Sequence, residues 1–126
     1  MKEAVLLLAH GSRRIEANEE WENIWQLFTK RHPNLLVSGS FIEFAEPNME
    51  KGVHLLIEKG AEKIYIVPLF LTVGNHLRQN IPERLHALQE QYKEVELVLT
   101  EHLGVDPLLV QIIEQRLAKQ GLQLSS

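Results

Sequence analysis

The sequence alternates short apolar runs with longer amphipathic stretches, and this alternation constrains the fold more than any other feature. The apolar runs cover residues 4–9, 35–44, 63–71 and 95–99. The first of them is continuously apolar, which is typical of a strand that is covered on both faces. Alternating strands and helices with short connections predict an α/β protein with a parallel sheet and right-handed crossovers.

Four helices are predicted from apolar side chains that recur three and four positions apart, and each set is expected to face the sheet. The sets are Trp21, Ile24, Trp25 and Phe28; Met49, Val53, Leu56 and Ile57; Ile81, Leu85, Leu88 and Tyr92; and Leu109, Ile112, Ile113 and Leu117. Pro68 lies inside the third apolar run, where we expect a strand end or a bulge. The whole pattern predicts a flavodoxin-like three-layer sandwich with a four-stranded parallel sheet of order 2-1-3-4.

Length and composition limit the classes of protein that fit. The 126 residues are expected to form a single domain, 1–126, with a frayed tail from about residue 120 to 126. The net charge is −4 without a basic cluster, which argues against a nucleic-acid partner. No apolar run reaches the length of a membrane span and no signal-peptide pattern is present. We therefore expect a cytoplasmic protein without a membrane partner.

The sequence contains six histidines and no cysteine. Any transition-metal site must therefore use His nitrogen and carboxylate oxygen, which suit divalent cobalt, nickel, iron or zinc. In a sheet of order 2-1-3-4, ligands bind beyond the carboxyl ends of the strands, between the first and third strands. His10 ends the first apolar run, His76 follows the third, and Glu43 and Glu46 close the second. The sequence thus predicts that these four side chains surround one crevice.

Other interpretations of these residues are open. A single histidine at a strand end often only bonds to backbone, and His102, after the fourth run, is either a loop residue or a secondary ligand. The turn at 10–12 is also compatible with a phosphate site, with Ser12 as a helix cap. It lacks the glycine spacing of a dinucleotide site and the Gly-Lys-Ser/Thr of a P-loop. A flavodoxin-like regulatory domain is disfavoured, because the first strand ends in histidine rather than in an acidic pair.

Five segments, in this order along nearly the whole chain, resemble the class II tetrapyrrole chelatases, and among these the short form of sirohydrochlorin cobaltochelatase. The segments are Leu-Ala-His-Gly-Ser-Arg at 8–13, Phe-Ala-Glu-Pro at 44–47, Val-Pro-Leu-Phe-Leu-Thr-Val-Gly-Asn-His at 67–76, Ile-Pro at 81–82 and Leu-Gly-Val-Asp-Pro at 103–107. One departure is Asn80, where the family often has Asp. The five motifs together, in this order, are more specific than His-Gly-Ser or any other one of them alone.

The resemblance implies an enzyme, a lyase that inserts a divalent metal into sirohydrochlorin on the way to cobalamin, siroheme or a nickel tetrapyrrole. Cobalt is the expected metal, with iron and nickel as alternatives, and no cofactor is permanently bound. His10 and His76 are implied as metal ligands, and a homodimer is implied as the assembly. Macrocycle contacts are implied for a residue of the Glu43–Glu46 stretch, taken here as Glu46, and for the loop residues Leu71, Thr72, Val73, Gly74, Asn75 and His76.

Metal insertion also requires two protons to leave the pyrrole nitrogens. Imidazole binds divalent ions reversibly and acts as a base at neutral pH, so His10 is the expected first proton acceptor. Glu43 or Glu46 is the expected second acceptor. A carrier that binds metal or tetrapyrrole without catalysis is the alternative to an enzyme.

Overall fold

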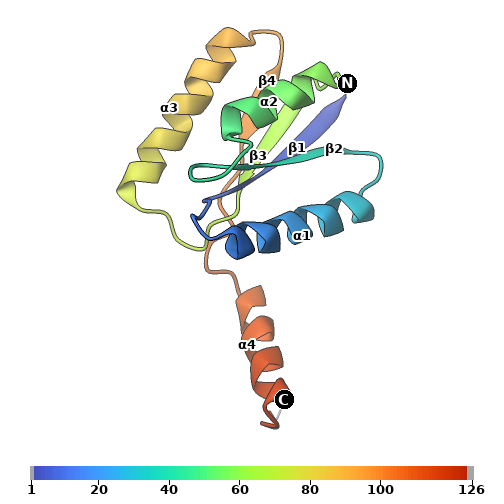
Figure 1. Ribbon diagram of the computed structural model, residues 1–126, viewed down its shortest axis with the longest axis vertical. Helices are drawn as coiled ribbons and strands as arrows, with labels where there is room; N and C mark the ends of the chain where they lie inside the picture. The colour runs from blue at the N-terminus through green and yellow to red at the C-terminus, as the bar shows by residue number, and fades with distance from the viewer. Residues whose placement is uncertain (1, 125–126) are drawn as a thin grey trace.

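The computed structural model describes residues 2–124 and consists of a four-stranded sheet flanked by helices (Figure 1). The elements in chain order are β1 (Glu3–Ala9), α1 (Ile15–Arg31), β2 (Leu36–Phe41), α2 (Met49–Glu58), β3 (Lys63–Pro68), α3 (Asn75–Gln91), β4 (Glu96–Leu99) and α4 (Leu108–Lys119). All strand pairs are parallel, and the order is β2-β1-β3-β4. The predicted α/β class and strand order are therefore confirmed.

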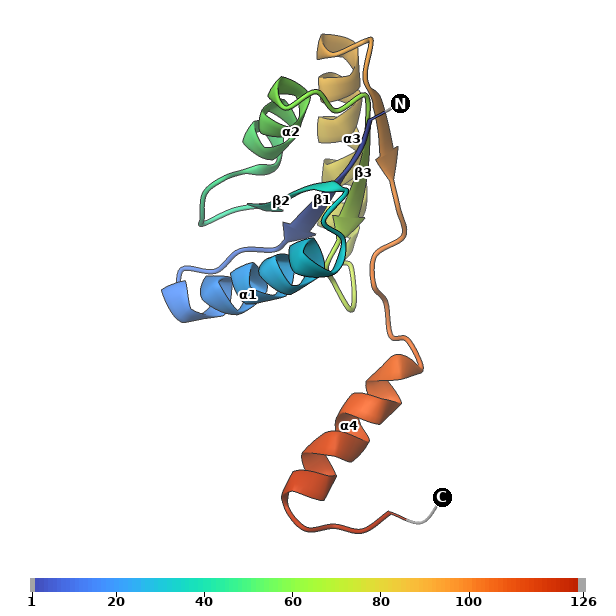
Figure 2. The same cartoon turned by 90° about the vertical axis from the view of Figure 1, so that its right-hand side faces the viewer.

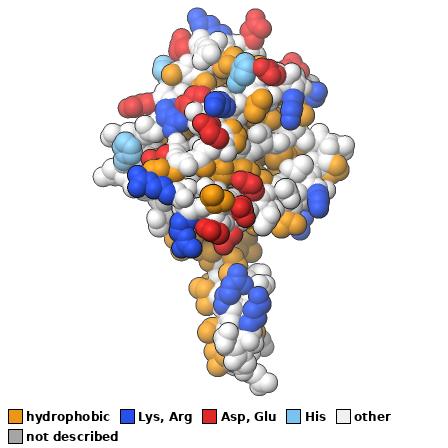
Figure 3. Space-filling model, viewed as in Figure 1, with side chains coloured by type: hydrophobic (Ala, Val, Ile, Leu, Met, Phe, Trp, Pro, Cys, Tyr) orange, Lys and Arg blue, Asp and Glu red, His pale blue; other side chains and the backbone are white. Residues whose placement is uncertain are grey.

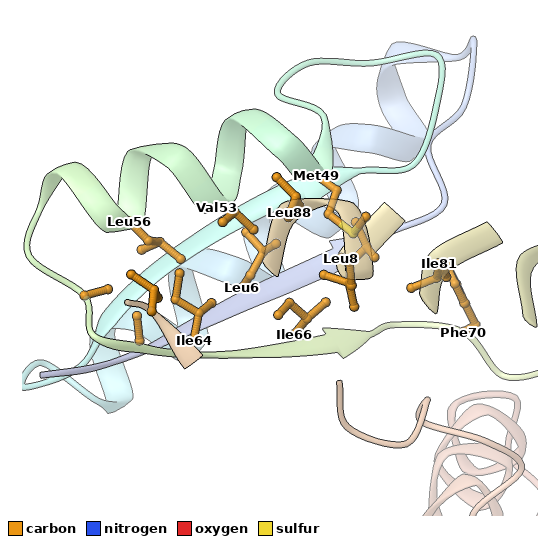
Figure 4. Packing of buried hydrophobic residues seen from close by; sticks show 14 residues of the cluster. Leu6, Leu8, Met49, Val53, Leu56, Ile64, Ile66, Phe70, Ile81 and Leu88 are labelled. Carbon is orange, nitrogen blue, oxygen red and sulfur yellow. The ribbon is translucent and has the colours of Figure 1, made fainter. Parts of the chain in front are cut away.

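The core lies between the sheet and the two helices α2 and α3 (Figure 4). Leu6 and Leu8 of β1 and Ile64 and Ile66 of β3 point to this side, because alternate strand residues share a face. All four are fully buried, and each such side chain contributes about 1.5–3 kcal/mol through its removal from water. The helices supply Met49, Val53, Leu56, Ile81, Leu85 and Leu88.

On the opposite side of the sheet, α1 packs on β2. The Trp25 ring lies directly over Gly39, where an added Cβ would approach the ring to 2.0 Å, so only glycine fits there. The same ring also contacts Phe41, with 4.9 Å between the two ring centroids. Of the four side chains predicted to face inward from α1, Ile24 is exposed. The contact of α1 with the sheet is thus centred on the aromatic residues.

The ends of the elements follow local chemistry. β3 ends at Pro68, as predicted, whereas β2 ends at Phe41 and is shorter than the apolar run that predicted it. α2 begins after Asn48, whose side-chain oxygen accepts a hydrogen bond from the Lys51 amide at 2.9 Å. α3 begins at Asn75, ahead of its first apolar marker Ile81, and so includes the polar stretch before it.

The prediction that α4 turns its apolar stripe onto the sheet is wrong. α4 projects beyond the carboxyl ends of the strands (Figures 1 and 2), and Ile112 and Ile113 are 43% and 57% exposed. The physical reason lies in the segment before it, which is bonded to the end of β3. The Leu103 and Gly104 amides donate to the Pro68 and Phe70 carbonyls at 3.2 and 3.0 Å. The helix therefore starts already past the edge of the sheet.

The chain after α4 is short. Residues 121–124 lie outside any helix or strand and are exposed, while the last part of the expected frayed tail, 125–126, lies outside the described residues. None of the helices in residues 2–124 is both long enough and apolar enough to span a membrane.

Candidate functional site

The site is built on the ladder between β1 and β2, which continues past both strands. The Ile42 amide donates to the Ala9 carbonyl at 2.9 Å, and the Glu43 amide donates to the His10 carbonyl at 3.1 Å. These bonds place the two side chains side by side at the carboxyl edge, with 3.6 Å between His10 Nε2 and Glu43 Oε1. Each side chain is about half exposed, so a ligand can reach both.

A glycine permits this close approach. Gly11 has φ +94°, and a Cβ at this position would lie 1.8 Å from the Glu43 carbonyl oxygen. Glycine is the residue that adopts such a φ without strain, and it also leaves room for the neighbouring backbone. On the other side of Glu43, Phe44 has φ +68°, and the Arg13 guanidinium lies 4.8 Å above its ring. The loop after β1 and the loop after β2 thus contact each other through backbone and side chains.

A buried asparagine fixes the turn that follows His10. The Ser12 amide donates to Asn18 Oδ1 at 2.9 Å, and Asn18 Nδ2 donates to the Ser12 carbonyl at 2.9 Å. The N-cap of α1 is Arg14, whose own amide donates to Ser12 Oγ, so Ser12 is not the helix cap that the sequence offered as one reading. The role of Asn18 was not predicted from the sequence. Its position three residues before Trp21, on the inward face of α1, was a signal for it. Among the described residues of α1, Asn18 is the buried polar side chain.

The imidazole of His10 is oriented by its own turn. Nδ1 donates to the Gly11 carbonyl at 3.2 Å, since a carbonyl oxygen only accepts. In the neutral ring this tautomer leaves the Nε2 lone pair free, on the side of Glu43, to bind a metal ion or to accept a proton. The Phe70 ring lies against the imidazole in an edge-to-face arrangement, with 6.0 Å between the centroids and 67° between the ring planes.

Glu46 faces a different neighbourhood from Glu43. Its Oε2 accepts from the Asn48 amide at 3.2 Å and lies 3.4 Å from Lys51 Nζ. These contacts tie it to the beginning of α2. The structure thus pairs His10 with Glu43 and gives Glu46 separate partners.

His76 lies in the first turn of α3, at the same edge of the sheet. The loop before it is open, since Leu71, Thr72, Gly74 and Asn75 are exposed and Val73 is half-buried. Among residues 2–124, no three side chains of His, Asp or Glu converge into a metal-binding group. His10 and His76 therefore share the edge, but with Glu43 they do not form a closed set of ligands.

A cavity of about 440 Å³ opens beside the His10–Glu43 pair, between α3 and the end of β4. Its lining is mostly apolar and consists of Pro68, Phe70, Val73, Leu77, Arg78, Ile81, Pro82, Leu99, Thr100, Glu101 and His102. Phe70 belongs to both features, because its ring lines the cavity and contacts His10. From the sequence, Phe70 and Val73 were expected to line a ligand surface at this edge, His102 was placed there as a loop residue or secondary ligand, and Arg78 was noted as a cation within reach. The contributions of Leu77, Leu99 and Thr100 to the lining were missed.

An ion pair between α2 and α3 fixes the helices that frame this edge. Arg84 Nε donates to Glu50 Oε2 at 2.8 Å, and its Nη2 donates to the other carboxylate oxygen. This hydrogen bonding lowers the pKa of Glu50 below its ordinary range, although partial burial acts in the opposite direction. The pair holds α3, and with it the cavity wall, against α2.

Three comparisons identify the relatives of the chain. Sirohydrochlorin ferrochelatase of Priestia megaterium is 35% identical over 115 residues, which cover 91% of this chain and 43% of that protein. Sirohydrochlorin cobaltochelatase of Saccharolobus islandicus is 31% identical over 121 residues, covering 89% of this chain and 91% of that one. The structure of SirB from Bacillus subtilis with Fe3+ superposes with a TM-score of 0.88 at 28% identity, covering 98% of this chain and 49% of SirB.

The fold is that of the class II chelatases. The profile of the CbiX family matches residues 4–120, and the chain belongs to this family. The chain spans less than half of the Priestia megaterium relative and about half of SirB. The resemblance seen in the sequence is therefore confirmed at the level of the family.

Proposed function

We propose that this chain inserts a divalent metal ion into sirohydrochlorin, with cobalt as the preferred metal and iron or nickel as alternatives. The observation that carries the proposal is the His10–Glu43 pair, which stands at the sheet edge beside a largely apolar cavity. The names of the relatives, a ferrochelatase and a cobaltochelatase, support the same substrate. They leave the choice between metals open.

The pair suits the removal of pyrrole protons. Two N–H protons must leave the macrocycle for each metal ion that enters. Nε2 of His10 takes the first, because its lone pair is free in the tautomer that Nδ1 fixes. The carboxylate of Glu43 stabilises the imidazolium so formed and takes the second proton. Of the two carboxylates considered from the sequence, Glu43 is favoured as this acceptor, because Glu46 is engaged by Asn48 and Lys51.

His10 and His76 hold the incoming metal in this proposal. Because Nε2 of His10 has a single lone pair, it takes its proton only as the metal leaves it for the macrocycle. The absence of a closed ligand cluster among the described residues suits a metal that is delivered and released, since a closed four-ligand site retains its ion. Residues 71–76, which run from the loop before α3 into its first turn, and Glu46 are proposed to contact the macrocycle. Phe70 and Val73 offer it apolar surface. The metal is a substrate here, and no resident cofactor is proposed.

The test is an absorbance assay with sirohydrochlorin and each of Co²⁺, Fe²⁺ and Ni²⁺. We expect His10→Ala to lower the insertion rate by about a hundredfold or more, which is the usual contribution of a positioned base. His86→Ala is the matched control, because His86 is exposed on α3 and lies outside the proposed machinery. Full activity of a folded His10→Ala variant would refute the site.

Two further variants separate the carboxylates and the alternative function. Glu43→Gln should lower the rate much more than Glu46→Gln, and equal effects would contradict the assignment of the second base. A protein that binds sirohydrochlorin or metal in stoichiometric amounts without forming metalated product would instead be a carrier. A homodimer is part of the proposal, because an edge this open gains cover from a second copy.

A further inference from the structure

The substrate proposed above is a polyanion, whereas the chain that would bind it is itself acidic. Sirohydrochlorin carries carboxylate arms around the rim of its ring, and the protein has a net charge of −4. On the face shown in Figure 3, basic and acidic side chains are interspersed over the body of the molecule, without one large basic patch. The overall field of the protein therefore does not attract the substrate, and individual cations at the sheet edge must do so.

Most of the cations around this edge are already neutralised by the chain itself. Three of them are held in ion pairs, namely Arg14–Glu16, Lys51–Glu46 and Arg84–Glu50. Arg13 and Arg78 lie at the same edge, are exposed, and take part in none of the ion pairs formed within residues 2–124. These two guanidinium groups are therefore available to an anionic ligand.

Arg13 is held in place by an aromatic ring. Its guanidinium lies 4.8 Å from the centre of the Phe44 ring. Phe44 is 52% exposed and has φ +68°, a conformation that costs free energy in any residue with a side chain. A guanidinium stacked on a ring keeps its N–H edge free, and this edge can form paired hydrogen bonds with a carboxylate. The stack thus presents an oriented carboxylate-binding group one residue after Glu43.

Arg78 stands in the cavity between α3 and the end of β4. Its backbone is fixed in the first turn of α3, where its amide donates to the Gly74 carbonyl at 3.1 Å. The lining is mostly apolar, so a charge pair formed there is screened less than one in open water. The cavity also contains one carboxylate, Glu101, just after β4. An anionic arm is therefore attracted on the α3 side of the cavity and repelled on the β4 side.

The strand order places the two arginines on opposite sides of the His10–Glu43 pair. Arg13 stands with Phe44 at the end of β2. Arg78 stands beside the ends of β3 and β4, and β1, which leads into His10, lies between the two positions. Three inter-strand spacings separate β2 from β4, a distance of about 14 Å. A tetrapyrrole with its side arms can bridge this span with its centre over the pair.

We propose that Arg13 and Arg78 bind two carboxylate arms at opposite ends of the macrocycle and so fix which pyrrole nitrogens lie over the His10–Glu43 pair. The inference rests on the proposed function and adds to it the groups that select the substrate by the positions of its charges. Neither arginine reaches the reacting nitrogens. Their loss therefore weakens substrate binding and raises KM, while kcat changes much less.

The first experiment measures insertion of Co²⁺ into sirohydrochlorin at steady state, with binding of metal-free sirohydrochlorin measured separately by equilibrium dialysis. Arg13→Gln and Arg78→Gln should each raise KM and Kd about tenfold to a hundredfold, the usual contribution of hydrogen bonds to a charged group. Arg31→Gln is the matched control, because it removes the same charge at the far end of α1. Circular dichroism checks that all three variants fold.

The outcomes separate this inference from the function on which it rests. A wild type that binds sirohydrochlorin without inserting any metal would overturn the proposed function. An active wild type whose KM and Kd are unchanged in both arginine variants would overturn the role of the arginines and leave the function intact. An equal rise in Arg31→Gln would do the same, because it would reduce the effect to net charge.

A second experiment tests the sign of the charge in the cavity. Glu101→Gln removes the carboxylate beside Arg78 and should lower KM severalfold, opposite to the effect of Arg78→Gln. The KM of the wild type should also rise with added NaCl more steeply than that of Arg78→Gln, because salt screens the pair that this variant lacks. If both cavity variants shift KM in the same direction, or if all chains share one salt dependence, the cavity does not recognise a carboxylate and the proposal is refuted.

Discussion

Replacement of Gly11 by alanine tests the construction of the site most directly. The new Cβ would stand 1.8 Å from the Glu43 carbonyl oxygen and 3.3 Å from Cβ of Phe41. Non-bonded atoms of this kind rarely approach within 3.0 Å, so Glu43 or the turn must move by about 1.2 Å. The backbone conformation at φ +94° adds a cost of roughly 1–2 kcal/mol for any residue with a side chain.

These effects add to a measurable loss of stability. The displacement weakens the hydrogen bond from the Glu43 amide to the His10 carbonyl, a bond of about 1 kcal/mol. Alanine restricts the unfolded chain and returns roughly 0.4–1 kcal/mol. The net destabilisation, with the steric contact included, is about 2–4 kcal/mol. For a chain of this length it lowers Tm by about 8–15 °C.

The assay is thermal unfolding followed by circular dichroism at one fixed protein concentration, because an oligomer has a concentration-dependent Tm. The matched control is Gly74→Ala, where φ is −75° and an added Cβ meets no atom within 4 Å. Its Tm should change by no more than about 4 °C, the effect of a slightly poorer helix cap. Equal shifts for the two variants would refute the close approach of the two loops as the reason for glycine at position 11.

Two further predictions concern the frame of the site. Gly39→Ala forces the Trp25 ring off β2 and should destabilise the protein by about 2–4 kcal/mol with a change in Trp fluorescence; an unchanged spectrum would contradict the contact. Glu50→Gln removes a carboxylate whose pKa is lowered by Arg84. The contribution of the Glu50–Arg84 pair to stability is therefore complete above pH 4.5, the ordinary pKa, and is lost as the pH falls through the lowered pKa. The Tm difference from wild type should therefore be largest near neutral pH and shrink below pH 4.5, and a difference independent of pH would contradict the pairing.

The sheet was predictable from the sequence because its signals are local. Continuous apolar runs mark buried parallel strands, and the connection rules then leave few orders, of which 2-1-3-4 is the observed one. Pro68 ended its strand as expected, because proline cannot donate to a ladder. The start of α3 was hidden, since its first residues are polar and exposed and carry no periodic apolar pattern.

The remaining features depend on contacts that no short segment encodes. The periodicity of α4 predicted its apolar face correctly, but the sequence does not say which surface that face meets. The pairing of His10 with Glu43 follows from strand order, whereas the separate partners of Glu46 follow from the turn into α2. The burial of Asn18 could not be predicted from its helix alone, because it depends on two hydrogen bonds with the backbone of Ser12 in the preceding turn.

The position of Glu43 just beyond an edge strand has a consequence for the motion of the site. Among the described strands β2 has β1 as its one neighbour, while on its other side the Phe41 amide donates to the Pro47 carbonyl at 2.9 Å. The last bonds of the ladder with β1 belong to the Ile42 and Glu43 amides. Strand ends at a sheet edge open locally at much lower free energy than the core. Each such opening separates the carboxylate from the imidazole without unfolding the protein. Hydrogen exchange of these two amides therefore measures the fraction of time for which His10 and Glu43 stand together as a pair.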